Sequence, residues 1–285
     1  AIGTRMITIT VNSDVLVTAG SSIETTFGIS KNSVAFVGAN GTGTKTYSIS
    51  PTVSGITINA TTGVVNASST LGFDSTTTSY LETITATDSV GFIAQTTMLV
   101  TVNRSIVMSG GSNVTTTRGR ADSSTAFVAT YGTGTKTFTI SPNISGITVN
   151  SSTGVVSVAA TTAAGTYIET VTATDSVTAT GKIALTIVVN PEIQIAGGAT
   201  LYTTVTIPRS SVPFTQVAGT GTGSKYFSLT PTISGITIDS VTGVVTADGT
   251  IAAGTYYESV TSTDSLGVKG YKALTVQINS AIVLT

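Results

Sequence analysis

The sequence predicts an all-β protein built from three tandem β-sandwich modules. The chain of 285 residues repeats itself at offsets of 91 and 89 residues. Each repeat contains short alternating segments of Val, Ile, Thr and Tyr that are separated by Gly, Pro, Asn and Ser, and no stretch keeps a helical period. Solenoid units are only about 20 to 50 residues long, so a repeat near 90 indicates one complete sandwich for each repeat.

Two blocks carry the repeat. The first is "GTGTKTYSISPTVSGITINATTGVV" from Gly41, "GTGTKTFTISPNISGITVNSSTGVV" from Gly132 and "GTGSKYFSLTPTISGITIDSVTGVV" from Gly221. The second is "YLETITATDSVG" from Tyr80, "YIETVTATDSVT" from Tyr167 and "YYESVTSTDSLG" from Tyr256. The same order of blocks in all three repeats predicts three homologous modules.

The elements of one module can be assigned in chain order. "GTGTK" is predicted to be a hairpin, since a phosphate-binding loop of the Walker type needs Gly directly before Lys and Thr44 stands there. "SPTVSGITIN" is typical of a strand end, a turn and a new strand. "NATTGVV" predicts a second hairpin with Gly63 at positive φ, and Gly154 and Gly243 hold the same position in the other modules.

Four similar junctions set the predicted boundaries. They are "VNSDVLV" from Val11, "VNRSIVM" from Val102, "VNPEIQI" from Val189 and "INSAIVL" from Ile278. Each would join the last strand of one module to the first strand of the next. The predicted modules are therefore residues 12–102, 103–189 and 190–279.

The two terminal segments do not fit inside these modules. "RMITITVN", from Arg5 to Asn12, resembles the last strand of a preceding module, and "SAIVLT" resembles the first strand of a following one. An apolar strand with an unpaired edge invites another strand. We expect residues 1–11 and 280–285 to pair with flanking modules, or with neighbouring copies in a head-to-tail manner.

The C-terminal two-thirds of each repeat carries a resemblance. "SGITVNSSTGVVSVAATTAAGTYIETVTATDSV" is similar to the putative-Ig and cadherin-like modules of bacterial and phage surface proteins. The resemblance implies three Ig-like (cadherin-like) Greek-key sandwiches of seven strands each, forming an elongated rod. It also implies a spacer, stalk or adhesive role, although such a widely shared fold does not fix a function.

Composition excludes several classes of function. Charged residues make up 9% of the chain and the net charge is -1, so no basic surface for nucleic acid is available. No apolar stretch is long enough to insert into a membrane. The chain has no Cys, His or Trp, which removes the common zinc sites and the nucleophilic triads. We therefore expect a protein that is not an enzyme.

One aspartate follows the last residue of each "TAT" or "TST" segment. In the cadherins that the modules resemble, an Asp at this position binds calcium between domains, which would make Asp88, Asp175 and Asp264 candidate metal ligands. Asp74 could stand for a further ligand in module 1 only. Calcium needs six to eight oxygens, so we expect no metal site or cofactor and assign these aspartates to hydrogen bonds within the following turn.

Strand alternation also places charges toward the core. Tyr167, Glu169 and Val171 share a face, and Lys136 shares a face with Phe138. Because a lone buried charge costs several kcal/mol, we predict one ion pair in each module. The predicted pairs are Lys45 with Glu82, Lys136 with Glu169 and Lys225 with Glu258. The alternative is a Lys–Asn isopeptide bond, resembling that of pilin domains, with Asn12, Asn103 and Asn190 as the amides.

Two classes of function remain open. The first is a non-enzymatic structural or adhesive repeat, such as a stalk, fibre or filament component that is extracellular, on a cell or virion surface. The alternative is a module that binds a surface glycan or protein through its end loops. Module 3 departs mildly from the other two in "TIPRSSVPFTQ", from Thr206 to Gln216, as that alternative predicts.

Overall fold

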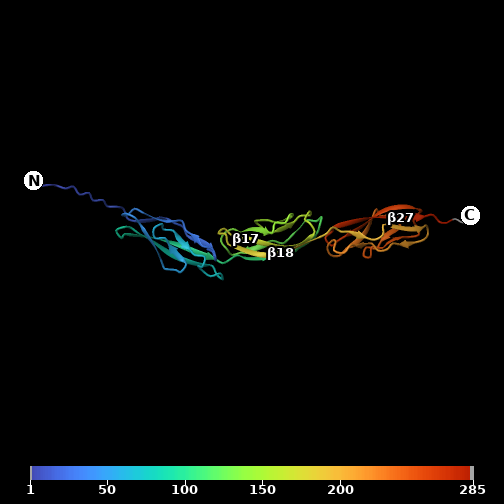
Figure 1. Cartoon of the computed structure of the whole chain (residues 1–285), viewed down its shortest axis with the longest axis horizontal. Helices are drawn as coiled ribbons and strands as arrows, with labels where there is room; N and C mark the ends of the chain where they lie inside the picture. The colour runs from blue at the N-terminus through green and yellow to red at the C-terminus, as the bar shows by residue number, and fades with distance from the viewer. Residues whose placement is uncertain (1, 283–285) are drawn as a thin grey trace. The chain divides into compact units, whose positions relative to one another are not determined.

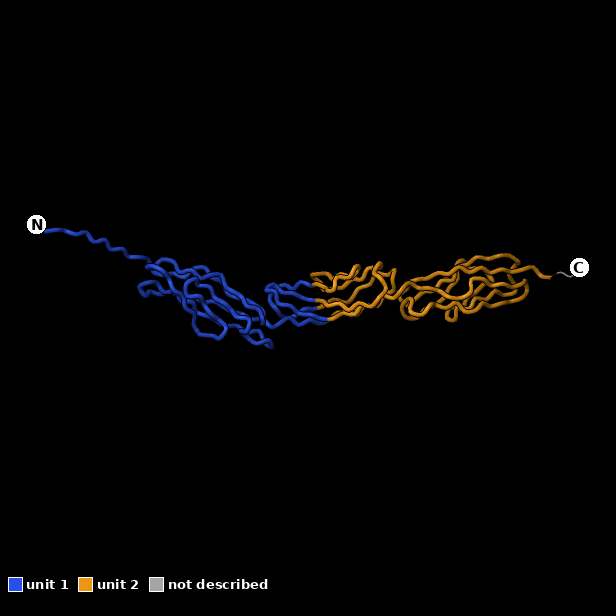
Figure 2. Tube along the Cα trace, in the orientation of Figure 1, with its two compact units in different colours: residues 1–109, 128–138, 172–183 blue, residues 110–127, 139–171, 184–285 orange. Residues whose placement is uncertain are grey.

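The computed structural model describes residues 2–282, and within this range the chain is all-β (Figure 1). The predicted fold class is confirmed: the strands form three successive β-sandwiches. The same residues contain no helix that could serve as a membrane span. The chain divides into two compact units (Figure 2), unit 1 with residues 1–109, 128–138 and 172–183, and unit 2 with 110–127, 139–171 and 184–285. Module 1 lies in unit 1 and module 3 in unit 2.

Module 1 contains nine short strands. They are β1 (Leu16–Ala19), β2 (Ile23–Thr26), β3 (Lys31–Asn32), β4 (Phe36–Ala39), β5 (Thr46–Ser50), β6 (Ile56–Ile58), β7 (Val65–Ala67), β8 (Thr78–Thr87) and β9 (Ile93–Asn103). One sheet has the order β2-β9-β8-β5, and the remaining strands form two smaller sheets, β3-β7-β6 and the pair β1-β4. Strand β2 runs parallel to β9, whereas β8 runs antiparallel to β9.

This order is that of a seven-strand Greek-key sandwich. The first strand is interrupted between β1 and β2 and so contributes to both sheets, and the second strand is interrupted between β3 and β4. The nine strands therefore correspond to the seven that were predicted, in two layers of strands that enclose one core.

The other two modules repeat this topology. Module 2 comprises β10 (Val107–Gly110), β11 (Val114–Thr117), β12 (Asp122–Ser123), β13 (Phe127–Thr130), β14 (Thr137–Ser141), β15 (Ile147–Val149), β16 (Val156–Val158), β17 (Gly165–Thr174) and β18 (Thr180–Asn190). Module 3 comprises β19 (Ile195–Ala196), β20 (Thr200–Thr204), β21 (Arg209–Ser210), β22 (Thr215–Gln216), β23 (Tyr226–Thr230), β24 (Ile236–Ile238), β25 (Val245–Ala247), β26 (Gly254–Thr263) and β27 (Lys269–Asn279). The sheet orders β11-β18-β17-β14 and β20-β27-β26-β23 match that of module 1. The segment of module 3 that departs in sequence thus keeps the common topology.

The core of each module is made by alternating residues of its long strands. In β17, Val171 and Ala173 are buried, whereas Ile168 on the other face is 73% exposed. The cores of modules 1 and 3 centre on equivalent residues, such as Phe36 in module 1 and Phe214 in module 3. The predicted assignment of faces on this strand is therefore confirmed.

The predicted turn between β6 and β7 is confirmed as well. Gly63 has φ +69°, and Gly154 and Gly243 adopt φ +69° and +68°. A Cβ atom at Gly63 would also collide with the carbonyl oxygen of Phe36. Both the left-handed backbone and the close approach of Phe36 require glycine at this position.

The prediction for "GTGTK" is wrong. Strand β4, before it, pairs with β1, whereas β5, after it, pairs with β8 in the other sheet. The segment is therefore a loop that crosses between the two sheets and cannot be a hairpin. We call residues 41–44 of module 1, and their counterparts 132–135 and 221–224, the crossing loop.

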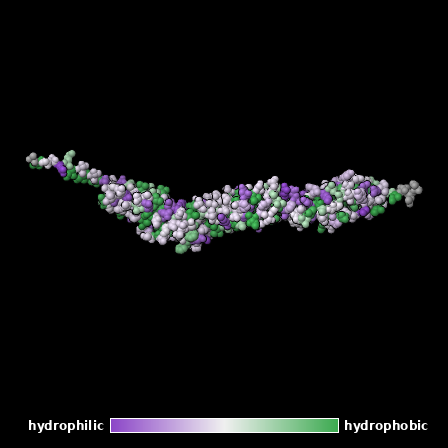
Figure 3. All heavy atoms as spheres, in the orientation of Figure 1, coloured by the Kyte–Doolittle hydropathy of each residue, from purple (hydrophilic) through white to green (hydrophobic). Residues whose placement is uncertain are grey.

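The terminal segments lie outside the sandwiches. Residues 2–15 form no strand, and Met6 and Ile9 are exposed, as the apolar patches on this segment in Figure 3 illustrate. Residues 280–282 also form no strand. Residue 1 and residues 283–285, which belong to the predicted donor segments 1–11 and 280–285, lie outside the described residues. Pairing of these segments with another module stays a prediction.

Candidate functional site

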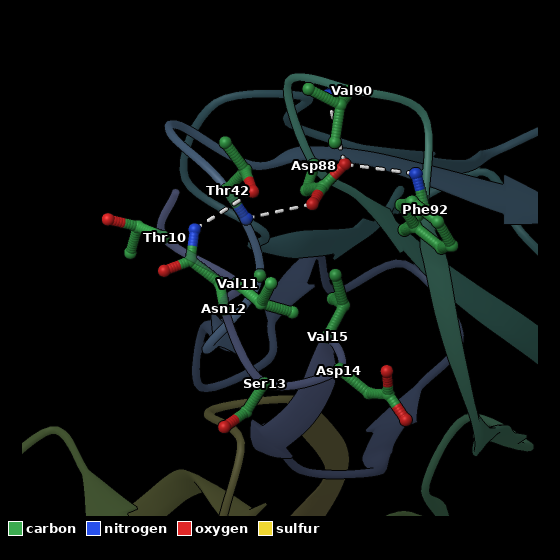
Figure 4. Close-up of a pocket in the computed structure, with 11 residues that line it drawn as sticks. Thr10, Val11, Asn12, Ser13, Asp14, Val15, Thr42, Asp88, Val90 and Phe92 are labelled. Carbon is green, nitrogen blue, oxygen red and sulfur yellow. Dashed lines mark hydrogen bonds between the residues drawn. The ribbon is translucent and has the colours of Figure 1, made fainter. Parts of the chain in front are cut away.

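The aspartate and serine that follow β8 hold the crossing loop of module 1 (Figure 4). Asp88 Oδ2 accepts the backbone N–H of Thr42 at 2.8 Å, and Oδ1 accepts those of Val90 and Phe92 at 3.0 and 2.9 Å. Ser89 Oγ donates to the carbonyl oxygen of Thr42 at 2.9 Å. The Asp-Ser pair therefore satisfies both backbone groups of Thr42 and fixes the loop against the end of the sandwich.

The same arrangement recurs in modules 2 and 3. Asp175 accepts the N–H groups of Thr133, Val177 and Ala179, and Asp264 accepts those of Thr222, Leu266 and Val268, all at 2.8 to 2.9 Å. The expectation that these aspartates accept backbone hydrogen bonds in the following turn is confirmed. We call the Asp and the loop Thr, such as Asp175 with Thr133, the head of a module.

The head of module 2 also binds a side chain of module 1, within unit 1. Thr26, the last residue of β2, donates its hydroxyl to Asp175 Oδ2 at 2.5 Å. Its oxygen lies 2.9 Å from Thr133 Oγ1, which accepts Asn103 Nδ2 at 3.1 Å. Thr26 and Asn103 are register partners at the end of module 1, and we call such a pair the tail of a module.

These contacts have only one consistent direction. An ionised carboxylate can only accept, so the single proton of the Thr26 hydroxyl is used on Asp175. The Thr133 hydroxyl must then donate to Thr26 while it accepts from Asn103. The result is a relay of amide, hydroxyl, hydroxyl and carboxylate in which each donor polarises the next.

The second junction repeats the relay within unit 2. Thr117 Oγ1 donates to Asp264 Oδ2 at 2.7 Å and lies 2.7 Å from Thr222 Oγ1. Asn190 Nδ2 donates to Thr222 Oγ1 at 2.8 Å, and Thr117 and Asn190 are register partners. Thr26 and Thr117 are both fully buried. Two junctions with different linker residues therefore use the same four side chains.

Hydrogen bonding sets the ionisation of the head aspartates. Burial alone would raise the pKa of Asp175, but the hydrogen bonds from Thr133 and Thr26 outweigh it and the pKa lies below its ordinary value. The same holds for Asp264: burial would raise its pKa, but the hydrogen bonds from Thr117 and Thr222 outweigh burial and lower it. The junctions are therefore built around carboxylates that stay ionised at neutral pH.

The linker of the first junction adds further contacts within unit 1. The Arg104 guanidinium lies 3.8 Å from the centre of the Tyr131 ring, a cation–π geometry. Asp74 Oδ1 accepts the backbone N–H of Ser105 at 2.9 Å. Asp74, which the cadherin resemblance made a candidate ligand, thus fixes the linker.

Metal ligation was the second interpretation of the head aspartates. Across residues 2–282, no group of three or more Asp, Glu, His or Cys side chains is close enough to hold a metal ion. Both oxygens of Asp175 and Asp264 are already used by N–H and O–H donors. An ion at either position would have to displace these bonds.

The predicted ion pairs inside the modules are wrong. Glu82, Glu169 and Glu258 are buried as predicted, with 0%, 0% and 5% of their surface exposed. Neither carboxyl oxygen of any of the three has a hydrogen-bond partner within residues 2–282. The predicted partners lie elsewhere: Lys45 Nζ and Lys136 Nζ donate to the carbonyl oxygens of Gly43 and Gly134, and Lys225 is exposed.

Strand register explains the error. In module 1, Thr46 pairs with Thr87 and Ser50 with Thr83, which puts Lys45 beside the Asp88 end and Glu82 beyond Ser50. Lys45 is level with Asp88, six residues from Glu82, so at about 3.3 Å for each residue the two levels are roughly 20 Å apart along the strand. Lys225 and Glu258 are separated in the same way, because Tyr226 pairs with Thr263 and Thr230 with Ser259. Residues on one face need not lie at one height.

The amides of the isopeptide alternative are used differently. Asn12, Asn103 and Asn190 each donate Nδ2 to the hydroxyl of a head threonine. Their recurrence at the junctions therefore has a hydrogen-bonding explanation.

Sequence reasoning missed the threonines of the relay. The signal was present: the Thr-Thr pair ending at Thr26 recurs at Thr117 and Thr204, and the loop Thr42 recurs at Thr133 and Thr222. Threonine is so frequent in strands that these positions could not be told from ordinary strand residues.

No protein-family model matches the chain, and no curated protein matches it either. Among solved structures, the I-band fragment I67-I69 from titin aligns over 95% of this chain and 99% of its own, with 8% identity and a TM-score of 0.45. Mouse cadherin-23 EC22-24 aligns over 92% and 96%, with 15% identity and a TM-score of 0.33. Protocadherin gamma B2 domains 3-6 align over 93% and 73%, with 12% identity and a TM-score of 0.32. The fold assignment rests on the sheet topology described above.

Proposed function

We propose that this chain is a non-enzymatic structural or adhesive repeat protein, a stalk, fibre or filament component displayed on a cell or virion surface. The observation that carries the proposal is the relay that joins tail to head at both junctions. A string of independent binding domains needs no such link, whereas a spacer that transmits position or force does.

The relay is built to resist bending. The threonines that donate to the carboxylates, Thr26 and Thr117, are buried, and hydrogen bonds to charged groups contribute about 1.5 to 3 kcal/mol each. Breaking the contact would also leave a buried carboxylate one donor short. Each junction therefore favours one arrangement of its two module ends.

The proposed surface location rests on the sequence. The repeats resemble surface modules of bacteria and phages, and the chain is rich in Thr, Ser and Gly with 9% charged residues. Such a composition offers neither a basic patch for nucleic acid nor the His and Cys that most catalytic and zinc sites use.

Nuclear magnetic relaxation tests the spacer role. We expect the modules of the intact chain to tumble with a common correlation time, and those of the double variant Thr26→Val, Thr117→Val to tumble with shorter, separate ones. Thr237→Val, an exposed position on β24, is the matched control and should behave as the unchanged chain. Independent tumbling of the modules in the unchanged chain would contradict the proposal.

A further inference from the structure

The head of module 1 resembles the heads of modules 2 and 3, and the segment before it resembles the linkers that precede them (Figure 4). Asn12 Nδ2 donates to Thr42 Oγ1 at 3.0 Å, as Asn103 does to Thr133. Gly41 N–H donates to the carbonyl oxygen of Ser13, as the equivalent glycines do at the other heads. Asp14 points away from the aspartate of this head (Figure 4).

One component is missing from this head in the described part of the chain. Asp88 Oδ2 accepts the N–H of Thr42, but no hydroxyl donates to it as Thr26 donates to Asp175. The Thr42 hydroxyl, which accepts from Asn12, likewise lacks the threonine to which it would donate. The head of module 1 is therefore an acceptor site that already holds an asparagine, Asn12, but not a tail threonine.

The tail of module 3 has the complementary property. Thr204 and Asn279 are register partners on β20 and β27, as Thr26 and Asn103 are in module 1. Val205 N–H donates to the carbonyl oxygen of Asn279, as the residue after the tail threonine does in modules 1 and 2. Thr204 is half-buried, and its hydroxyl makes no hydrogen bond within residues 2–282, whereas Thr26 is fully buried.

We propose that the tail of module 3 docks onto the head of module 1 in a second copy of this chain. Thr204 would donate to Asp88 of the other copy and accept from its Thr42, which completes the relay seen at both internal junctions. The inference deepens the proposed function, on which it rests. Because head and tail are different surfaces, the contact does not close on itself and leads to linear head-to-tail assembly.

The contact should be weak. Stable interfaces bury roughly 1,200 Å² or more, whereas the docking rests on only two hydrogen bonds of Thr204. Residues 2–11, which are exposed and unpaired with any described strand, would also have to move aside. A covalent trap that accumulates short-lived complexes is therefore the appropriate measurement.

Disulfide trapping has no competing native thiols, because the chain contains no cysteine. Thr42→Cys and Thr204→Cys chains are mixed and oxidised, and the mixed dimer, which has the same mass as the two homodimers, is followed by mass spectrometry of the disulfide-linked proteolytic peptides. Thr26 Oγ1 and Thr133 Oγ1 lie 2.9 Å apart at the internal junction, so equivalent cysteines are well placed to bond. We expect the mixed dimer to form about tenfold faster than with Thr237→Cys replacing Thr204→Cys, because docking of the two module ends raises the local concentration of one thiol at the other.

Two further chains separate the possible failures. The double variant Thr26→Cys, Thr133→Cys should close a disulfide within one chain. If it closes and the mixed dimer forms no faster than the control, docking between copies is wrong and the proposed function stands. If it does not close, the internal relay is wrong and both proposals fail. Sedimentation of the unchanged chain, which keeps its hydroxyls, should show association that increases with concentration. The Thr204→Val variant should associate less. Equal association of the two chains would overturn the docking.

Discussion

Each module buries one glutamate whose carboxyl group has no hydrogen-bond partner in the described part of the chain. Burial raises the pKa of Glu82 and Glu169, and it raises the pKa of Glu258 to about 7. Ordinary glutamates titrate near 4.3, so these groups stay protonated in the folded chain at pH values where the unfolded chain is ionised. The head aspartates shift in the opposite direction, since their hydrogen bonds favour the ionised form.

The sign of the glutamate effect follows from linkage. Below about pH 4 the glutamates are protonated in both the folded and the unfolded chain and have no effect on the pH dependence. Between that pH and the raised pKa, the unfolded chain loses protons that the folded chain keeps, so the free energy of unfolding falls as pH rises. The lowered pKa of the aspartates has the reverse effect and costs stability when pH falls through it.

We expect Glu258→Gln to remove the loss of stability that module 3 suffers as pH rises. A pKa shift from 4.5 to about 7 corresponds to about 3 kcal/mol. Between pH 4 and pH 8, the free energy of unfolding of the variant should therefore rise by about that amount relative to the unchanged chain. Urea unfolding of module 3 at the two pH values measures it. Glu192→Gln, at an exposed glutamate, is the control and should gain nothing. Equal pH dependence of Glu258→Gln and the unchanged chain would show that the carboxyl group is solvated.

At the level of elements, the turn between β6 and β7 combines two constraints. Its asparagine or aspartate accepts two backbone N–H groups, as Asn59 Oδ1 does from Thr61 and Thr62 at 3.0 and 2.9 Å. Gly63 then turns the chain with positive φ directly against Phe36. The turn thus fixes the register of β6 and β7 and packs them on the second strand.

We expect Gly63→Ala to destabilise module 1 by about 2 to 4 kcal/mol. A left-handed backbone costs a residue with a Cβ about 1 to 2 kcal/mol, and overlap with the Phe36 carbonyl adds a packing cost of similar size. Gly28→Ala is the matched control: Gly28 has φ +87° but open space around it, so only the backbone cost applies. Chemical unfolding of both variants measures the difference. Equal losses would mean that the chain around Phe36 relaxes freely.

Local patterns explain what the sequence predicts well at this level. Alternation along β17 identifies its buried face, and the "TTGVV" turn identifies a positive φ, because both are decided by neighbouring residues. The Lys45–Glu82 pair failed because height along a strand depends on register with a distant strand. The relay was missed because Thr26 and Asp175 are 149 residues apart and only the completed fold brings them together.

Across the whole chain, the same set of four side chains connects the modules at both internal junctions. Asn, Thr, Thr and Asp recur at both internal junctions, although the linkers differ, with Arg104 at one and Pro191 at the other. Arg118 and Glu192 add an ion pair of 3.7 Å near the second junction, but both are exposed, so the pair contributes little. Coupling between modules therefore depends on buried, uncharged donors that act on one carboxylate.

This chemistry predicts that the chain does not need calcium. At the first internal junction, Asp175 Oδ1 accepts two N–H groups and Oδ2 accepts one N–H and the Thr26 hydroxyl, so its usual acceptor positions are filled. Calcium would have to break these bonds, and it would find no group of three or more Asp, Glu, His or Cys side chains close enough together to hold it in the described part of the chain, whereas it needs six to eight oxygens. We expect thermal unfolding with excess calcium and with a chelator to give the same midpoint. Asp175→Asn, which keeps the size of the side chain but removes the charge and replaces one accepting oxygen with an NH2 donor, should lower that midpoint equally in both conditions. A midpoint that rises with calcium in the unchanged chain and not in Asp175→Asn would establish an ion at the junction in place of the relay.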